Sequence, residues 1–246
     1  MDTLERWLLR ITPIVTFAFG LASLAAIFFW VPSDKMLGLS QRIFYWHVPA
    51  ATACFLAFGI AGVASIGYLR TRGSQWDHAA HAAVSVGMLF ATIVLVTGCI
   101  WAHTAWGAWW TGDPRLTTFL VLWLVFASYV MLRVFARDNE MAPRYAAVLA
   151  IVGAVNMPLV MMATRLFRSI HPQIVGNPNG GIDDPRMVTA LMLGFAAHLG
   201  LVLWLWAMRL SQLRSQERIE LLEADLRDEE QYAMSRSVLS QRSAST

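Results

Sequence analysis

Six long apolar stretches dominate the sequence, at roughly 12–31, 48–69, 79–101, 118–135, 144–164 and 187–208. A helix needs about 20 apolar residues to cross a bilayer, and each stretch is near that length. In lipid a spanning segment must satisfy its backbone hydrogen bonds internally, as a helix does. The sequence therefore predicts an all-α polytopic membrane protein with six transmembrane helices.

Composition narrows the possible functions. Charged residues make up 14% of the chain, whereas soluble domains carry about 25%, so an ordinary soluble enzyme is not expected. The net charge is +3 without a long basic block, which argues against nucleic acid as a partner. Cys54 and Cys99 both lie inside apolar stretches and fit neither a disulfide framework nor a metal-binding spacing.

The distribution of arginine predicts the orientation in the membrane. Six helices put both termini on one side. That arrangement gives nine arginines near the membrane on the side of the termini, against six basic residues in the opposite loops. The positive-inside rule then places both termini in the cytoplasm. The first stretch is too long for a signal peptide and lacks a clear small-x-small cleavage site, so we expect it to be an anchor.

The C-terminal segment 211–246 differs from the membrane domain 1–210. Ile219, Leu222 and Leu226 recur at helical spacing among charged residues, which predicts that the sixth helix continues into the cytoplasm to about residue 231. From Ser235 the chain is rich in serine and poor in apolar residues, so we expect the end to be disordered.

Tryptophan is concentrated in the second outer loop. Trp106, Trp109 and Trp110 lie within five residues, with Gly107 between them. An aromatic belt at the membrane surface explains single tryptophans such as Trp101. Three indoles on one glycine-containing loop exceed what anchoring requires, and they are typical of a platform for a large planar ligand.

Two histidines lie at the same side of the membrane. His47 precedes Pro49 at the outer mouth of the second helix, and His171 lies in the third outer loop. They are either unrelated interfacial histidines or the two axial ligands of one haem iron, since neutral imidazole is a common iron ligand. Arg42 and Arg115 would then suit the two propionates, because a guanidinium group matches a carboxylate.

The other candidate residues carry weaker signals. His78 and His81 share one face at the inner start of the third helix, where a solvated cap is favoured over a metal or haem contact. His198 lies deep in the sixth helix. It is either a functional residue or a hydrogen-bonded core histidine. His103 lies inside the tryptophan loop and is only a weak candidate for a further ligand. Asp113 is expected to cap the fourth helix.

Three motifs carry a family resemblance. Residues 42–51 read RIFYWHVPAA, the tryptophan loop ends with RLT at 115–117, and residues 155–158 read VNMP. These motifs resemble the cytochrome c maturation protein C family, also called haem exporter protein C, a family of tryptophan-rich haem-handling membrane proteins. The resemblance covers nearly all of residues 1–210, with six helices in the same places.

The resemblance implies a haem b site at the outer face of the bacterial inner membrane. Family members pass haem to a periplasmic haem chaperone, cytochrome c maturation protein E. Their other partners are an ABC transporter (maturation proteins A and B) and the small membrane protein D. By position, His47 and His171 match the axial histidines, while Gly112 stands where the family usually has tryptophan. The remaining predicted haem contacts are Trp106, Trp109, Trp110, Asp113, Arg115 and Arg42.

The predicted function is to bind haem at the outer face and present it to the chaperone during cytochrome c maturation. The alternative is a bis-histidine b-type membrane electron carrier or a quinol oxidoreductase subunit. Electron transfer across a membrane requires histidine pairs inside the helices, and only His198 lies deep in one. We find no independent catalytic motif, so the sequence leaves open whether the protein is an enzyme.

Overall fold

The computed structural model describes residues 3–34, 38–137, 139–171, 182 and 184–244. These residues form six α-helices and two short helical turns, and within them we find no regular strand. The elements are α1 (Thr3–Ala25), the π-helical turn η1 (Ala26–Trp30), the 3-10 turn η2 (Leu39–Ile43), α2 (Phe44–Thr71), α3 (Ser74–Trp106), α4 (Pro114–Phe135), α5 (Ala142–Leu166) and α6 (Pro185–Ala244). Six segments are long and apolar enough to cross a membrane, which confirms the predicted fold class.

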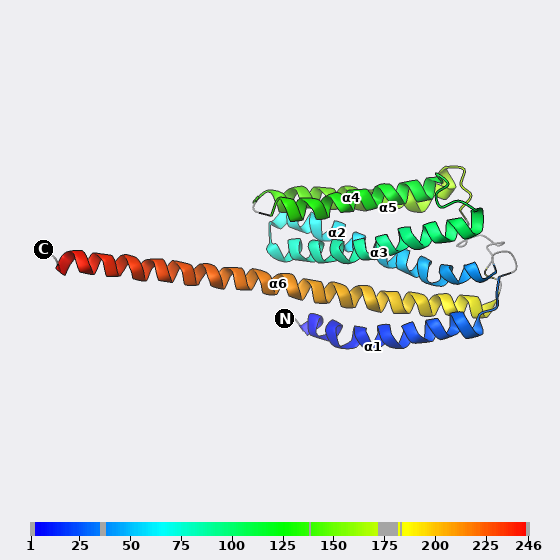
Figure 1. The fold of residues 1–246 in the computed structure, drawn as a ribbon, viewed down its shortest axis with the longest axis horizontal. Coiled ribbons are helices and arrows are strands. Elements are labelled where there is room, and N and C mark those ends of the chain that lie inside the picture. The colour runs from blue at the N-terminus through cyan, green and yellow to red at the C-terminus, as the bar shows by residue number, and fades with distance from the viewer. Residues whose placement is uncertain (1–2, 35–37, 138, 172–181, 183, 245–246) are drawn as a thin grey trace.

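The helices pack in layers (Figure 1). Helices α2 and α3 form the middle layer, with the pair α4 and α5 on one side and α6 on the other, and α1 packs on the outer side of α6. The outward faces carry large exposed apolar side chains, among them Phe17 on α1, Val134 on α4 and Val155 on α5. Apolar surface of this extent has to be covered, and lipid covers it in a membrane protein.

A pair of stacked aromatic rings holds the middle layer against the α4–α5 pair. The rings of Phe58 and Phe126 are parallel within 5°, with centroids 3.6 Å apart, and both side chains are fully buried. Gly87 lies against the ring of Phe58 and Gly153 against that of Phe126, and neither position has room for a Cβ atom. Small residues let membrane helices approach closely, and here they make space for the aromatic stack.

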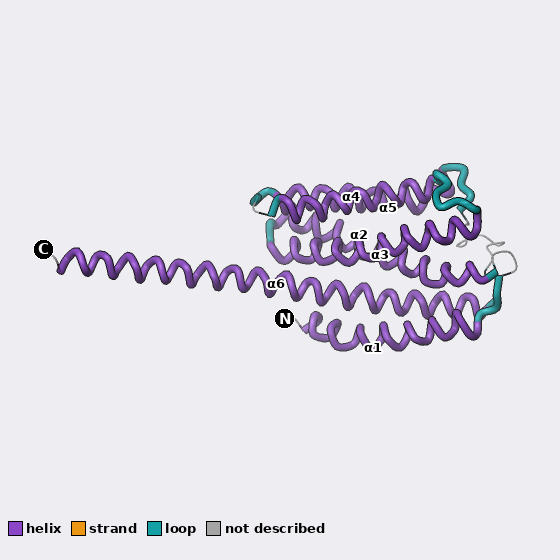
Figure 2. The backbone as a smooth tube through the Cα atoms, in the orientation of Figure 1, coloured by secondary structure: helices purple, strands orange, loops and turns teal. Residues whose placement is uncertain are grey.

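The connections divide the bundle into two different ends (Figure 2). Helices α2 and α3 are joined by a tight turn, where Arg72 closes α2 with a positive φ of 59°. A second short turn joins α4 to α5. We call this end the tail end, because α6 extends beyond the bundle there. The opposite end, which we call the loop end, carries the longer connections. Residues 107–113 and His171 lie in these connections, and His47 lies at the same end in the first turn of α2.

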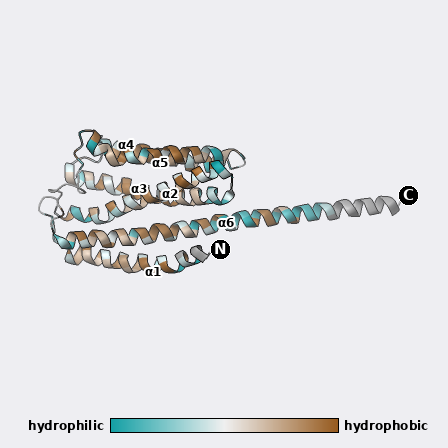
Figure 3. Ribbon diagram, turned by 180° about the vertical axis from the view of Figure 1, so that it is seen from behind, coloured by the Kyte–Doolittle hydropathy of each residue, from teal (hydrophilic) through white to brown (hydrophobic). Residues whose placement is uncertain are grey.

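Helix α6 continues far beyond the bundle, and the part of this extension that Figure 3 colours by hydropathy is mainly hydrophilic. Two contacts tie it to the tail end: Glu217 lies 3.7 Å from the Nδ1 atom of His78, and Glu220 accepts a hydrogen bond from Arg137 at 3.2 Å. The predicted helical continuation past residue 210 is therefore present. The structure gives helical backbone to Ala244, beyond the end near 231 that the sequence predicts. Serine disfavours a helix by only a few tenths of a kcal/mol per residue, too little to end one.

Candidate functional site

The first turn of α2 holds His47 against α3. The Nδ1 atom of His47 lies 2.8 Å from the Oγ1 atom of Thr97. The next residue, Gly98, faces the same imidazole, and a Cβ atom at that position would lie 3.3 Å from the Cε1 atom of His47. Pro49 is the sixth residue of α2, and because it has no N–H, the carbonyl of Tyr45 loses its helical hydrogen bond there. Thr97 and Gly98 therefore form the packing site of the His47 ring. Sequence reasoning did not identify this site.

His171 lies just after α5 and is held by a chain of hydrogen bonds. Its backbone N–H donates to the Oγ atom of Ser169 at 3.1 Å, and the Ser169 hydroxyl donates to the Oδ2 atom of Asp113 at 2.6 Å. The backbone N–H of Ile170 donates to the same Oδ2 atom at 3.0 Å. One carboxylate therefore ties the third loop to the start of α4.

Asp113 also caps α4, as the sequence predicts. Its Oδ1 atom accepts a hydrogen bond from the backbone N–H of Arg115 at 2.9 Å, and only 5% of the residue is exposed. Burial alone would raise the pKa of this carboxyl group. The hydrogen bonds from Ser169, Arg115 and Ile170 outweigh burial and leave the pKa below its usual value. An ionised Asp113 accepts all three hydrogen bonds, so its role here is to position the loop that carries His171.

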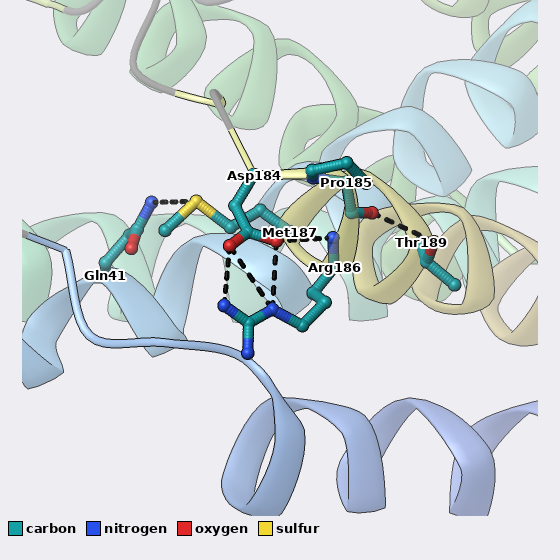
Figure 4. A network of polar contacts seen from close by, with 6 residues as sticks. All are labelled: Gln41, Asp184, Pro185, Arg186, Met187 and Thr189. Carbon is teal, nitrogen blue, oxygen red and sulfur yellow. Dashed lines mark hydrogen bonds and ion pairs between the residues drawn. The ribbon is translucent and has the colours of Figure 1, made fainter.

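The start of α6 repeats this arrangement with one difference (Figure 4). Residues 184–186 read Asp-Pro-Arg, as residues 113–115 do. The Oδ1 atom of Asp184 accepts from the backbone N–H of Arg186 at 2.8 Å, but its Oδ2 atom accepts from the Arg186 guanidinium at 2.7 Å. Nearby, Gln41 donates to the sulfur of Met187 at 3.9 Å, which joins η2 to α6. Asp184 is therefore paired within its own helix start, whereas Asp113 reaches across to another loop.

The tryptophans of the loop end form two groups. Trp101 and Trp106 pack edge to face with centroids 5.1 Å apart, and each ring lies 6.2 Å from that of His171. Trp109 is 58% exposed and Trp110 is 41% exposed. The ring of Trp109 stacks on His103 at 4.3 Å. The three tryptophans of the predicted platform therefore do not share one surface. Trp106, together with Trp101, packs near His171, whereas Trp109 and Trp110 are exposed.

Buried polar atoms without a hydrogen-bond partner occur at the loop end as well as in other parts of the described bundle. Among the described residues, the Nδ1 atom of His171, the Nε1 atom of Trp101 and the Oγ1 atom of Thr111 are such atoms. Each unsatisfied buried group costs about 1–3 kcal/mol. Native structures keep few of them without a reason, and a ligand is one such reason. The donor set at this end therefore fits a bound group.

His171 is neutral at physiological pH. Burial, then the positive charge of Arg115 and then His47, lowers its pKa to about 4, although Asp113 acts in the opposite direction. A neutral imidazole has the free lone pair that a metal ion requires.

The two predicted arginines lie in different surroundings. Arg115 is half-buried at the start of α4, close enough to His171 to affect its charge. The guanidinium of Arg42 lies over the ring of Phe28, 5.5 Å from its centroid. Arg42 therefore shares the loop end, but its described contact is with an aromatic ring of η1.

The remaining histidines have structural partners. In α6, the Nδ1 atom of His198 lies 2.9 Å from the carbonyl oxygen of Gly194, and the ring packs edge to face on Trp46 at 5.0 Å. His198 is thus a hydrogen-bonded core histidine, one of the two expected alternatives.

At the tail end, Asp77 and Arg133 form a two-point ion pair with distances of 2.9 and 3.0 Å. Their side chains are only 13% and 15% exposed, and that of His78 is 13% exposed. The Nδ1 atom of His81 lies 3.4 Å from Arg133. The favoured interpretation of a solvated cap is wrong here, because α4 and α6 cover this face of α3. Sequence reasoning missed the ion pair, since it requires knowing which helices are neighbours.

Comparison with known proteins is consistent with this geometry. The family model described as heme exporter protein C matches residues 1–224. A protein of that name from Bradyrhizobium diazoefficiens is 33% identical over 222 residues, which is 89% of this chain and 82% of the relative. The relative from Rhodobacter capsulatus is 36% identical over 149 residues, 59% of this chain and 62% of its own length. The relative from Escherichia coli is 33% identical over 144 residues, 58% of this chain and 59% of its own length. The chain therefore belongs to the heme exporter protein C family.

Proposed function

We propose that this protein binds haem at the loop end and presents it to a haem chaperone during cytochrome c maturation. The observation that carries the proposal is the approach of His47 and His171. They come from α2 and from the segment after α5, yet both lie against the same end of α3. His47 contacts Thr97, and the ring of His171 lies 6.2 Å from that of Trp101, one helical turn farther along. Haem is the cargo, and its iron has two axial positions that a pair of neutral imidazoles can fill. The Nδ1 atom of His47 faces Thr97, which leaves its Nε2 atom for the iron.

The other residues of the loop end have separate roles in this proposal. Arg115 and Arg42 provide positive charge for the haem propionates, and a guanidinium group pairs well with a carboxylate. Trp109 and Trp110, both exposed, offer flat apolar surface to the porphyrin and to the incoming partner. Asp113 contributes by fixing the loop of His171 rather than by contacting the cargo.

The proposed partners follow from family membership. They are the periplasmic haem chaperone, cytochrome c maturation protein E, together with the ABC transporter subunits A and B and the small membrane protein D. The bound form is haem b, which is not covalently attached and can therefore be released. The protein lies in the bacterial inner membrane with the loop end in the periplasm and both termini in the cytoplasm, in line with nine arginines against six basic residues.

The alternative function, electron transport across the membrane, receives little support from the geometry. Such a carrier needs haem ligands inside the membrane, and His198 is the deeply placed candidate. Its ring packs against Trp46 and Phe90, and its Nδ1 atom contacts a backbone carbonyl. This environment is that of a packed core residue.

A haem-transfer assay tests the proposed function. Protein purified from haem-replete cells should carry one haem per chain and lose it to the haem-free chaperone. The double variant Trp109→Ala, Trp110→Ala should transfer haem at least about tenfold more slowly, since both indoles are exposed where the partner would dock. The control is Trp7→Ala, because Trp7 is similarly exposed on α1. Wild-type protein without haem, or a double variant with normal transfer, would contradict the proposal.

Thiol labelling tests the orientation separately. Cys54 and Cys99 are first replaced by alanine, and single cysteines are then introduced at Leu39 on η2 and Leu226 on α6, which are 64% and 60% exposed. An impermeant reagent added to intact cells with an opened outer membrane should label position 39 and not position 226. The reverse pattern would invert the topology and exclude a periplasmic haem site.

A further inference from the structure

The packing site of the His47 ring contains Thr97, whose hydrogen bonds have a fixed direction. Thr97 lies on α3, one turn before Trp101, and its Oγ1 atom contacts three groups. It lies 2.8 Å from the Nδ1 atom of His47, 2.7 Å from the carbonyl oxygen of Ile93 and 3.4 Å from that of Val94. Both Thr97 and His47 are partly buried, so these groups depend on each other more than on water.

The contact with Ile93 determines where the hydroxyl proton lies. A carbonyl oxygen only accepts hydrogen bonds, so at 2.7 Å the Thr97 hydroxyl must donate its proton to Ile93. A hydroxyl group has one proton to donate. The Thr97 Oγ1 atom therefore acts as the acceptor toward His47, and the Nδ1 atom of His47 carries the hydrogen. In the neutral ring this leaves the lone pair on Nε2.

Gly98 limits the movement of the same ring. A Cβ atom there would lie 3.3 Å from the Cε1 atom of His47, closer than ordinary van der Waals contact. The imidazole is thus held by a hydrogen bond at Nδ1 and by close backbone packing beside Cε1. Both restraints come from adjacent residues of one rigid helix, which fixes the direction in which Nε2 points.

We propose that Thr97 is the positioning residue for His47: it selects the tautomer with hydrogen on Nδ1 and holds Nε2 ready for the haem iron. The inference rests on the proposed function in one respect, namely that His47 is an axial ligand. Ligating histidines usually donate their second N–H to an acceptor, and loss of that acceptor typically weakens metal binding about 10- to 100-fold. The acceptor also makes the imidazole a stronger electron donor, which favours ferric over ferrous iron.

The test compares three variants of the full-length protein. Thr97→Val removes the acceptor, and Thr97→Ser keeps it. The matched control is Thr92→Val on the same helix. Thr92 donates to the carbonyl of Met88 at 2.8 Å and accepts from the indole N–H of Trp123 at 3.1 Å, so it loses the same kind of hydrogen bond without touching His47.

Three measurements follow. Nitrogen NMR of the haem-free protein should show His47 with hydrogen on Nδ1 in the wild type, in Thr97→Ser and in Thr92→Val. In Thr97→Val that preference should be lost, haem affinity should fall about 10- to 100-fold, and the haem reduction potential should become more positive. Thr97→Ser should restore all three values, which separates positioning from a general loss of fold.

Two results would overturn the inference: hydrogen on Nε2 of His47 in the wild type, or Thr97→Val with unchanged affinity and potential. Failure of the proposed function is recognised differently. His47→Ala would then leave the haem spectrum unchanged, whatever the tautomer of His47 in the haem-free protein.

Discussion

Both ends of the bundle hold histidines, but these have different surroundings. At the tail end, His78 lies beside Glu217 and His81 beside Arg133, which is itself paired with Asp77. At the loop end, the Nδ1 atom of His171 is buried without a partner among the described residues. Histidines alone do not reveal a binding site, since both ends have them. The unsatisfied ring nitrogen of His171 distinguishes the loop end.

The two ends also differ in how their charged side chains are compensated. At the tail end, the ion pair Asp77–Arg133 joins α3 to α4, and the ion pair Glu220–Arg137 joins α6 to the segment after α4. At the loop end, the carboxylate of Asp113 is used by Ser169 and by the backbone N–H groups of Arg115 and Ile170, not by a cation side chain among its described hydrogen bonds. The tail end is therefore built for stability, and the loop end retains positive charge and lone pairs for a ligand.

The largest effect on stability is expected at the tail end. Asp77→Ala leaves Arg133 largely buried without its counter-ion, which should lower the free energy of unfolding by about 3 kcal/mol. Haem bound per folded chain should not change. Thermal unfolding in detergent and a haem assay measure the two quantities. The double variant Asp77→Ala, Arg133→Met should recover much of the loss, and a fall in haem content of the folded fraction would refute the division between the ends.

A smaller effect separates the two Asp-Pro-Arg helix starts. Asp113→Ala and Asp184→Ala each remove a helix cap, which costs about 1 kcal/mol. Only Asp113 also holds Ser169 and Ile170, so only Asp113→Ala should weaken haem binding, by about tenfold or 1.4 kcal/mol. Haem titration of both variants measures this. Equal haem affinities in the two variants would show that the loop of His171 does not depend on Asp113.

The acid titration of His171 is a third expected difference. Its pKa is lowered to about 4, chiefly by burial and then by Arg115. The unfolded chain therefore binds this proton at higher pH than the folded chain, so His171 makes stability fall as pH decreases from about 6.5 toward 4. Histidine NMR of the haem-free protein should give a midpoint near 4. Arg115→Gln should raise it, and Arg186→Gln should leave it unchanged; a wild-type midpoint near 6.5 would contradict the burial of His171.

The smallest expected effect concerns the backbone of the tryptophan loop. Gly107 and Gly112 have φ values of 73° and 69°, and a Cβ atom at either position would have no neighbour within 4 Å. Alanine at either position should cost about 1 kcal/mol through the left-handed backbone alone. In contrast, Gly20→Ala on α1, which also has open space, should stabilise by up to about 1 kcal/mol. Thermal unfolding measures all three, and a neutral Gly112→Ala would exclude a backbone requirement there.

The lengths of the apolar stretches were sufficient to predict the fold, because a bilayer requires long apolar helices. The sequence also placed His47, His171 and Asp113 at one end, since each lies next to a predicted helix terminus. It could not identify Thr97, Gly98 or Ser169, whose contacts depend on which faces of neighbouring helices meet. It also could not separate Trp106 from Trp109, because the rotation of each indole is set by packing. The residue Gly112 departs from the family pattern, and its positive φ explains why glycine suits this backbone.

The absorption spectrum of the haem-loaded protein tests the central claim most directly. Wild-type protein should show six-coordinate low-spin iron with two imidazole ligands. His47→Ala and His171→Ala should each lose that spectrum, since each removes one axial ligand at the loop end. The double variant His78→Ala, His81→Ala at the tail end should keep it, because those rings are engaged with Glu217 and Arg133. If both loop-end variants keep the wild-type spectrum, or the tail-end variant loses it, the haem site does not lie at the loop end.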